Sequence, residues 1–100
     1  MASRLDLHSE LLTFLPNVYF QPPSTIEMTY PCIIYNKTGK FKTSANDDTY
    51  FSIQEYQLTV VDKNPDSTVA DDIEKHFQHC TISQYYTVDN LNHTTLNLYY

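Results

Sequence analysis

The sequence predicts one α+β domain in which two helices pack on a mostly antiparallel sheet of about five strands, in the order α-β-β-β-α-β-β. Its length of 100 residues suits a single modest core and is too short for a second one. Several short runs alternate apolar and polar residues with period two, as half-buried strands do, and two other stretches repeat apolar residues at helical spacing. Strands that follow one another before and after a helix favour an antiparallel sheet with the helices packed on it.

Residues 3–15 predict the first helix. Ser3 is a plausible N-cap, and Pro16 ends the helix because proline cannot continue it. We expect one side of this helix to carry the leucines Leu5, Leu11, Leu12 and Leu15.

Two strands are predicted next, at residues 18–20 and 30–36. The first ends before Pro22 and Pro23, since prolines cannot donate hydrogen bonds to a neighbouring strand. Residues 37–49 then predict a long polar connection that holds the only glycine, Gly39. Such a connection is expected to be mobile until a partner orders it.

Residues 50–62 form the strongest predicted strand, with a bulge or register change expected at residues 52–55. A turn at Pro65 leads to a second helix at residues 68–78. Asp66, Ser67 or Thr68 can accept hydrogen bonds from the free N–H groups at the start of this helix. One face of this helix should be an apolar stripe made by Val69, Ala70, Ile73 and Phe77.

The chain ends with two more predicted strands, at residues 81–88 and 94–100, joined by a turn at residues 89–92. In the last strand, Leu96, Leu98 and Tyr100 alternate with polar residues, so they should share the buried face.

Composition excludes several classes of protein. A formal charge of −6 disfavours tight nucleic-acid binding, which depends on lysine and arginine against phosphates. The N-terminal residues lack the apolar core of a signal peptide, and no run is long enough for a membrane span, so we expect a cytosol-like compartment. Two cysteines do not suggest a disulfide framework, and Cys32 and Cys80 are interpreted as small buried apolar residues.

Two groups of residues could carry chemistry, and both have simpler explanations. His76, His79 and Cys80 stand at zinc-ligand spacing, with His8 or His93 as a possible fourth ligand, but histidines also suit the end of a helix. The carboxylates suit turns and helix starts: Asp47, Asp48, Asp62, Asp66, Asp71 and Asp72. Phosphate-binding loops and hydrolase motifs are absent from the sequence, so we expect no enzyme activity, no metal and no cofactor.

The polar connection is the candidate interaction site. Lys37, Lys40 and Lys42 are three of the six basic residues, and they surround Phe41, which suggests a basic segment with an aromatic anchor for an acidic partner. A solvated loop with one apolar residue folded back is the alternative. The candidate interface residues are Lys37, Lys40, Phe41, Lys42, Asp47 and Asp48.

Four blocks, taken in order, resemble a known family. They are Leu15-Pro16-Asn17-Val18-Tyr19-Phe20-Gln21-Pro22-Pro23, Met28-Thr29-Tyr30-Pro31-Cys32-Ile33-Ile34-Tyr35, the segment 56–67, and Tyr85-Tyr86-Thr87-Val88-Asp89-Asn90-Leu91-Asn92-His93. Their order and spacing resemble the tail terminators, or tail completion proteins, of long-tailed bacteriophages, over nearly the whole chain.

The resemblance implies an α+β subunit of a hexameric ring on the head-proximal end of the tail tube. Such a ring stops tube polymerisation and presents a surface to the head completion or stopper protein, while DNA passes through without specific binding. It would be a virion component assembled in the bacterial host cytoplasm, with no membrane partner. Two alternatives remain: another neck component, such as a stopper or adaptor, and a small cytosolic enzyme or ligand-binding domain with a deep pocket at His76, His79 and Cys80.

Overall fold

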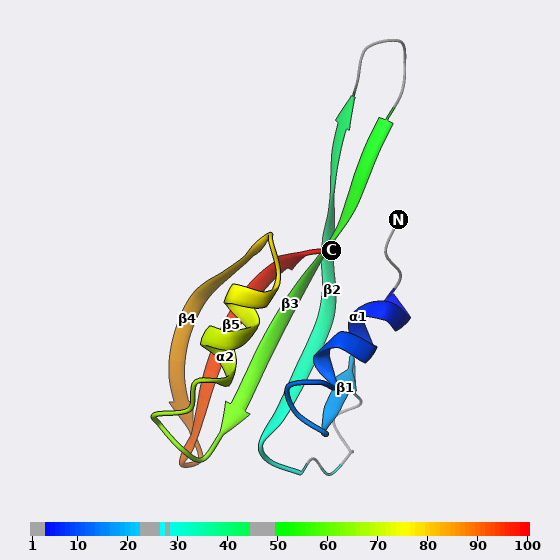
Figure 1. Ribbon diagram of the computed structural model, residues 1–100. Helices are drawn as coiled ribbons and strands as arrows, with labels where there is room; N and C mark the ends of the chain where they lie inside the picture. The colour runs from blue at the N-terminus through cyan, green and yellow to red at the C-terminus, as the bar shows by residue number, and fades with distance from the viewer. Residues whose placement is uncertain (1–3, 23–26, 28, 45–49) are drawn as a thin grey trace.

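The computed structural model describes residues 4–22, 27, 29–44 and 50–100, and the side chains at 41–44 and 50–52 lie outside this description. The predicted α+β class and element order are confirmed. The elements are α1 (Arg4–Leu11), β1 (Val18–Phe20), β2 (Cys32–Ser44), β3 (Tyr50–Asp62), α2 (Val69–His76), β4 (Cys80–Val88) and β5 (Leu91–Tyr99). Within these described residues they build one five-stranded sheet in the order β1-β2-β3-β5-β4, in which β1 and β2 are the only parallel pair (Figure 1).

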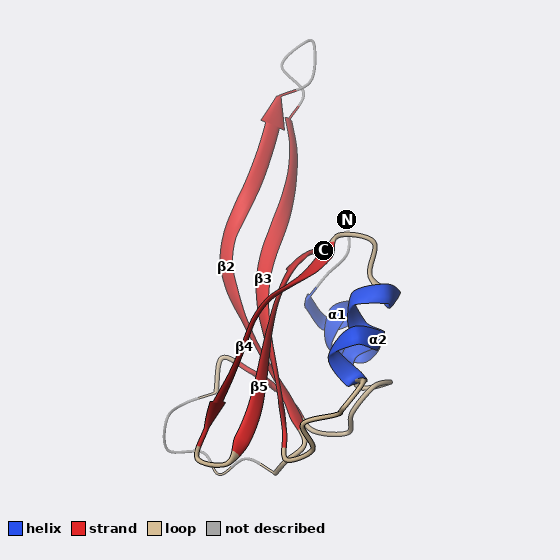
Figure 2. Cartoon of the chain, turned by 90° about the vertical axis from the view of Figure 1, so that its left-hand side faces the viewer, coloured by secondary structure: helices blue, strands red, loops and turns tan. Residues whose placement is uncertain are grey.

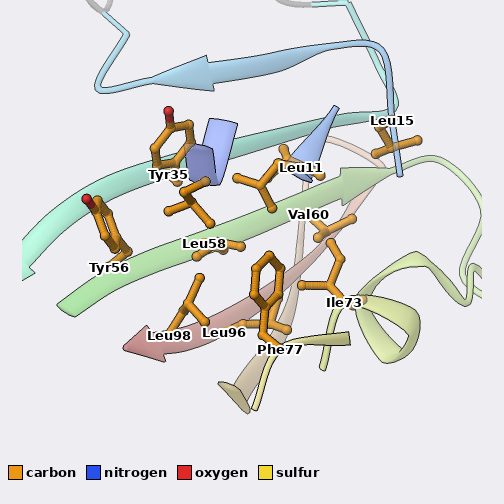
Figure 3. Packing of buried hydrophobic residues seen from close by; sticks show 13 residues of the cluster. Leu11, Leu15, Tyr35, Tyr56, Leu58, Val60, Ile73, Phe77, Leu96 and Leu98 are labelled. Atoms are coloured by element: carbon orange, nitrogen blue, oxygen red, sulfur yellow. The ribbon is translucent and has the colours of Figure 1, made fainter. Parts of the chain in front are cut away.

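Both helices lie on the same face of the sheet (Figure 2), and the core lies between them and the strands. The register shows how the alternation builds this layer, since Tyr35, Leu58 and Leu96 are neighbours across three strands and all three are fully buried. Helices and strands together enclose the core (Figure 3), which consists of Leu7, Leu11, Leu15, Ile33, Tyr35, Tyr56, Leu58, Val60, Ala70, Ile73, Phe77, Leu96 and Leu98.

The buried face of α1 differs from the prediction. Leu7, Leu11 and Leu15 are buried at four-residue intervals, whereas Leu5 and Leu12 are 67% and 44% exposed. Side chains four apart lie on one helix face, and Leu7 replaces the two exposed leucines in that stripe. The helix also ends at Leu11 instead of residue 15, and turns then lead the chain into β1.

The buried stripe of α2 is confirmed. Ala70, Ile73 and Phe77 are buried, and Val69 packs against them. Of the three residues predicted to accept N–H groups at its start, Ser67 accepts the Val69 N–H through Oγ at 3.4 Å, whereas Thr68, at the N-cap position, makes no side-chain cap hydrogen bond. The helix ends at His76, two residues earlier than expected, because the backbone at Phe77 is extended (φ −92, ψ 137).

The predicted polar connection at residues 37–49 is wrong over most of its length. Residues 37–44 continue β2 and pair with β3 up to Ser44 opposite Tyr50. A register change does fall at Glu55, at the end of the range expected for it, but the extra residue is Thr38 of β2, which lies between the pairs Lys37–Tyr56 and Gly39–Glu55. No described glycine has a positive φ, so Gly39 is an ordinary strand residue and does not make a turn.

The turn between β4 and β5 is tighter than predicted. Asp89 and Asn90 both have positive φ (52° and 63°), which is typical of a two-residue hairpin turn. Val88 therefore pairs directly with Leu91, and β5 begins there instead of at residue 94. Predicted burial of Leu96 and Leu98 is confirmed, and Tyr100 packs against the core as expected.

Candidate interaction surface

The most distinctive surface is a two-stranded arm, which we define as residues 37–44 of β2 and 50–54 of β3. β1 pairs with β2 no further than Tyr35, and β5 pairs with β3 only from Glu55 onward. Beyond those points the two strands pair with each other alone, and the arm projects from the body of the domain (Figure 1). The chain consequently measures 52 Å along its longest axis and 27 and 22 Å along the others.

Single hydrogen bonds mark where the sheet stops supporting each edge of the arm. On the β2 edge, Gln21 follows β1 with a positive φ of 43°, and its side-chain Oε1 accepts the Lys37 N–H at 3.2 Å. On the β3 edge, the Tyr100 N–H donates to the Gln54 carbonyl at 3.1 Å. Further out, neither edge pairs with another strand in the described part of the chain.

A polar network holds the base of the arm together. Thr38 Oγ1 donates to Glu55 Oε1 at 2.7 Å, and Gln54 Nε2 donates to the Gly39 carbonyl at 2.6 Å. Hydrogen bonds from Tyr99 and Thr38 lower the pKa of Glu55 below its ordinary value, and the same carboxylate raises the pKa of Tyr99. Sequence reasoning missed these residues, because only the register of three strands brings them together.

The structure places the predicted interface residues unevenly. Lys37 and Lys40 lie in the arm, exposed, and no described carboxylate is within ion-pair distance of either ammonium group. In the register, Phe41 and Lys42 face Ile53 and Ser52, with their side chains outside the description. Asp47 and Asp48 lie outside the described residues.

A ribbon of two strands is energetically weak by itself. An isolated hairpin is marginally stable in water, and three or more strands or a packed helix are needed for independent stability. Each free edge also presents unpaired N–H and C=O groups that a further strand can pair with. The arm therefore has the physical properties of a docking element, with two free edges and unpaired lysines.

The alternative metal site is not assembled. His76 Nε2 lies 3.3 Å from Glu10 Oε1, and His8 Nδ1 lies 2.7 Å from the Tyr35 hydroxyl. His93 lies stacked on Tyr86 with ring centroids 4.7 Å apart. Across the described ranges, no three histidine, cysteine, aspartate or glutamate side chains gather as metal ligands.

Two aspartates near α2 make hydrogen bonds that agree with their predicted roles in a turn and at a helix start. Asp62 Oδ1 accepts the Asn64 N–H at 2.9 Å and organises the turn after β3. Asp72 Oδ2 accepts a long hydrogen bond of 3.4 Å from Thr68 Oγ1 in the first turn of α2. Asp66 and Asp71 are exposed.

The cysteines are unsuited to nucleophilic chemistry. Cys32 is fully buried as predicted, whereas Cys80 is only half-buried, because it stands where β4 begins at the edge of the sheet. Burial raises the pKa of both thiols to about 11, so they stay protonated near neutral pH, and only thiolates react readily.

A cavity of about 270 Å³ lies at the end of the sheet opposite the arm. It opens between the β3–α2 connection, the start of α2 and the β4–β5 hairpin, and its lining includes Asp62, Asn64, Asp71, Tyr85 and Thr94. A hollow beside His79 and Cys80 is lined by neighbouring residues of β4 and β5 but does not include His76. The three-residue pocket expected of a ligand-binding domain is therefore not formed there.

No helix within the described residues is long and apolar enough to cross a membrane. No protein-family model matches the chain, and no curated protein is significantly similar to it.

Proposed function

We propose that the protein is a tail terminator of a long-tailed bacteriophage, a structural subunit of a ring that caps the head-proximal end of the tail tube. In this role it ends tube polymerisation and offers the head-attachment surface. It acts by binding and shape, without catalysis, metal or cofactor.

The projecting arm is the observation that carries the proposal. A ring subunit needs two different surfaces, each of which meets the other on its neighbour, and closure of the ring sets the number of copies. A strand pair that leaves the body of the domain offers one such surface, and the free edge of β4 at the other side of the sheet offers another. The α+β class also agrees with the fold implied by the sequence resemblance.

The charge balance supports the same role. At a formal charge of −6 per chain, a ring of several copies would repel the DNA phosphates. Repulsion lets DNA pass through a channel without sticking to its wall. The three lysines of the arm are the local exception, and they suit contact with protein better than the channel surface.

The decisive experiment is inactivation of the gene in the phage that carries it, with electron microscopy of the lysate. We expect filled heads without tails, together with tubes longer than those of the parent. A plasmid copy of the wild-type gene should restore normal particles, and a copy encoding Leu5→Ala, at an exposed position on α1, should restore them equally well.

The other outcomes separate the alternatives. Tails of normal length beside heads that have lost their DNA would identify a stopper or adaptor that seals the portal. Particles of normal yield and morphology would refute any role in the neck.

A further inference from the structure

The two ends of the molecule are chemically complementary. One end is the arm, with Lys37, Lys40 and Lys42 in its β2 strand. We call the other the acidic end, and it consists of Asp62, Asp66, Asp71, Asp89, Tyr85, Tyr86 and Val88. Asp62, Asp71, Tyr85 and Tyr86 line the cavity of about 270 Å³. Asp66 lies beside it in the β3–α2 connection, and Val88 and Asp89 lie at the β4–β5 turn.

In the part of the chain that the structure describes, exposed charges at both ends form no ion pairs. The ammonium groups of Lys37 and Lys40 form no ion pair with described residues. At the acidic end, Asp66, Asp71 and Asp89 are exposed, and none of their carboxylates forms an ion pair with another described residue, Lys63 of the same connection included. Opposite charges that are unpaired in the monomer are available to select and orient a partner.

Apolar and backbone groups accompany these charges. Tyr85 is 68% exposed, Tyr86 40% and Val88 47%, and all three lie on β4, an edge strand of the sheet. β4 pairs with β5 on one side only, so its exposed tyrosines combine contact area with a free strand edge, which suits the addition of another strand. Each strand of the arm has a free edge and can serve as the added strand.

The two ends cannot meet within one copy. β3 runs from the arm at Tyr50 to the acidic end at Asp62, and its 13 residues at about 3.3 Å each span roughly 40 Å. Figure 1 shows the arm and the β4–β5 turn at opposite ends of the sheet. Any contact between them is therefore a contact between copies, and it is heterologous, so repetition leads to a ring or a filament.

We infer that the arm of one copy docks on the acidic end of a second copy, with its lysines against Asp66 and Asp71 and its strand edge beside β4. This inference rests on the proposed function for the closed ring, but the contact itself is defined by these two surfaces alone.

Charge reversal with reciprocal rescue tests the contact in purified protein. The arm variant combines Lys37→Glu and Lys40→Glu, the acidic-end variant combines Asp66→Lys and Asp71→Lys, and a third variant carries all four changes. Lys75→Glu, at an exposed position on α2, is the control. Thermal melting confirms that each variant is folded, and sedimentation equilibrium measures self-association at low and at high salt, because screening weakens contacts between exposed charges.

We expect wild-type protein to associate, and each double variant to associate at least about tenfold more weakly, since like charges then face each other. The fourfold variant should recover most of the lost affinity, as should an equimolar mixture of the two double variants. The Lys75→Glu control should associate like the wild type.

Unchanged association of both double variants would overturn the inference, as would a wild-type chain that stays monomeric at every concentration tested. Neither result decides the proposed function, because a ring can form through other surfaces or only on the tube. Normal tails and heads after gene inactivation would instead refute the proposed function, whatever the sedimentation result.

Discussion

The corrected buried face of α1 leads to a stringent prediction that compares two leucines of the same helix. Leu11 is fully buried in the core (Figure 3), whereas Leu5 is 67% exposed. Replacing either by alanine makes the same chemical change in the same helix, so the effect of helix propensity is similar for both. The difference in stability between the two variants therefore measures burial.

The expected magnitude follows from the atoms removed. Leu11→Ala deletes three carbon atoms from the core, which at about 0.8 kcal/mol per buried methylene costs roughly 2.4 kcal/mol in transfer free energy. A residual cavity adds to this, and buried leucine truncations cost about 2.7 to 5.0 kcal/mol in total. We expect about 3 to 4 kcal/mol for Leu11→Ala, and less than about 0.5 kcal/mol for Leu5→Ala.

Urea unfolding followed by circular dichroism measures both values through linear extrapolation. A domain of this size has a stability of about 5 to 15 kcal/mol, so Leu11→Ala should remain folded or nearly so at low temperature. Its melting temperature should fall by about 12 °C or more, since each kcal/mol shifts the midpoint by about 4 to 8 °C in domains of 60 to 100 residues. Equal losses for the two variants would refute the assignment of the buried face.

Two further predictions concern ionisable groups. The Tyr100 hydroxyl donates to Glu10, and burial, followed by that carboxylate, raises the pKa of Tyr100 to about 12. The contribution of the Tyr100 hydroxyl to stability is fully present below about pH 10, its pKa in the unfolded chain, and is lost as pH rises through about 12. The free energy of unfolding, measured from pH 8 to 12, should therefore fall less steeply with pH for Tyr100→Phe than for the wild type. Identical slopes would contradict the role of this pair. Glu55 has a lowered pKa, so its contribution is present above its ordinary value of 4.5 and is lost as pH falls through the folded pKa. Glu55→Gln should speed hydrogen exchange in the arm at neutral pH with little change in the melting temperature, and unchanged exchange would show that the network at its base does not hold the arm.

Local patterns predicted an element correctly where its periodicity coincided with burial. The stripe of α2 and the alternation of β5 were both identified, because Ile73, Phe77, Leu96 and Leu98 face the same core. In the first helix, leucine is so frequent that several faces looked apolar. Only packing against the sheet selected Leu7 over Leu5.

The arm was missed for a different reason. Periodicity reveals a strand when one of its faces is buried, and residues 37–40 have no buried side chain. Their polar composition, with a glycine among them, is also typical of a loop. Lys37 and Lys40 were nevertheless identified as candidate contact residues, although the element that carries them was not.

The sequence by itself determined the α+β class, the order of the elements, the stripe of α2 and the charged, polar character of the candidate surface, because these depend on neighbours close along the chain. Only the tertiary structure decided that β1 runs parallel to β2, that β3 lies at the centre of the sheet and that residues 37–44 extend it as an arm. Strand partners are chosen among segments far apart in sequence, by burial on a shared face, and the network of Thr38, Glu55 and Tyr99 exists only once three such strands are in register.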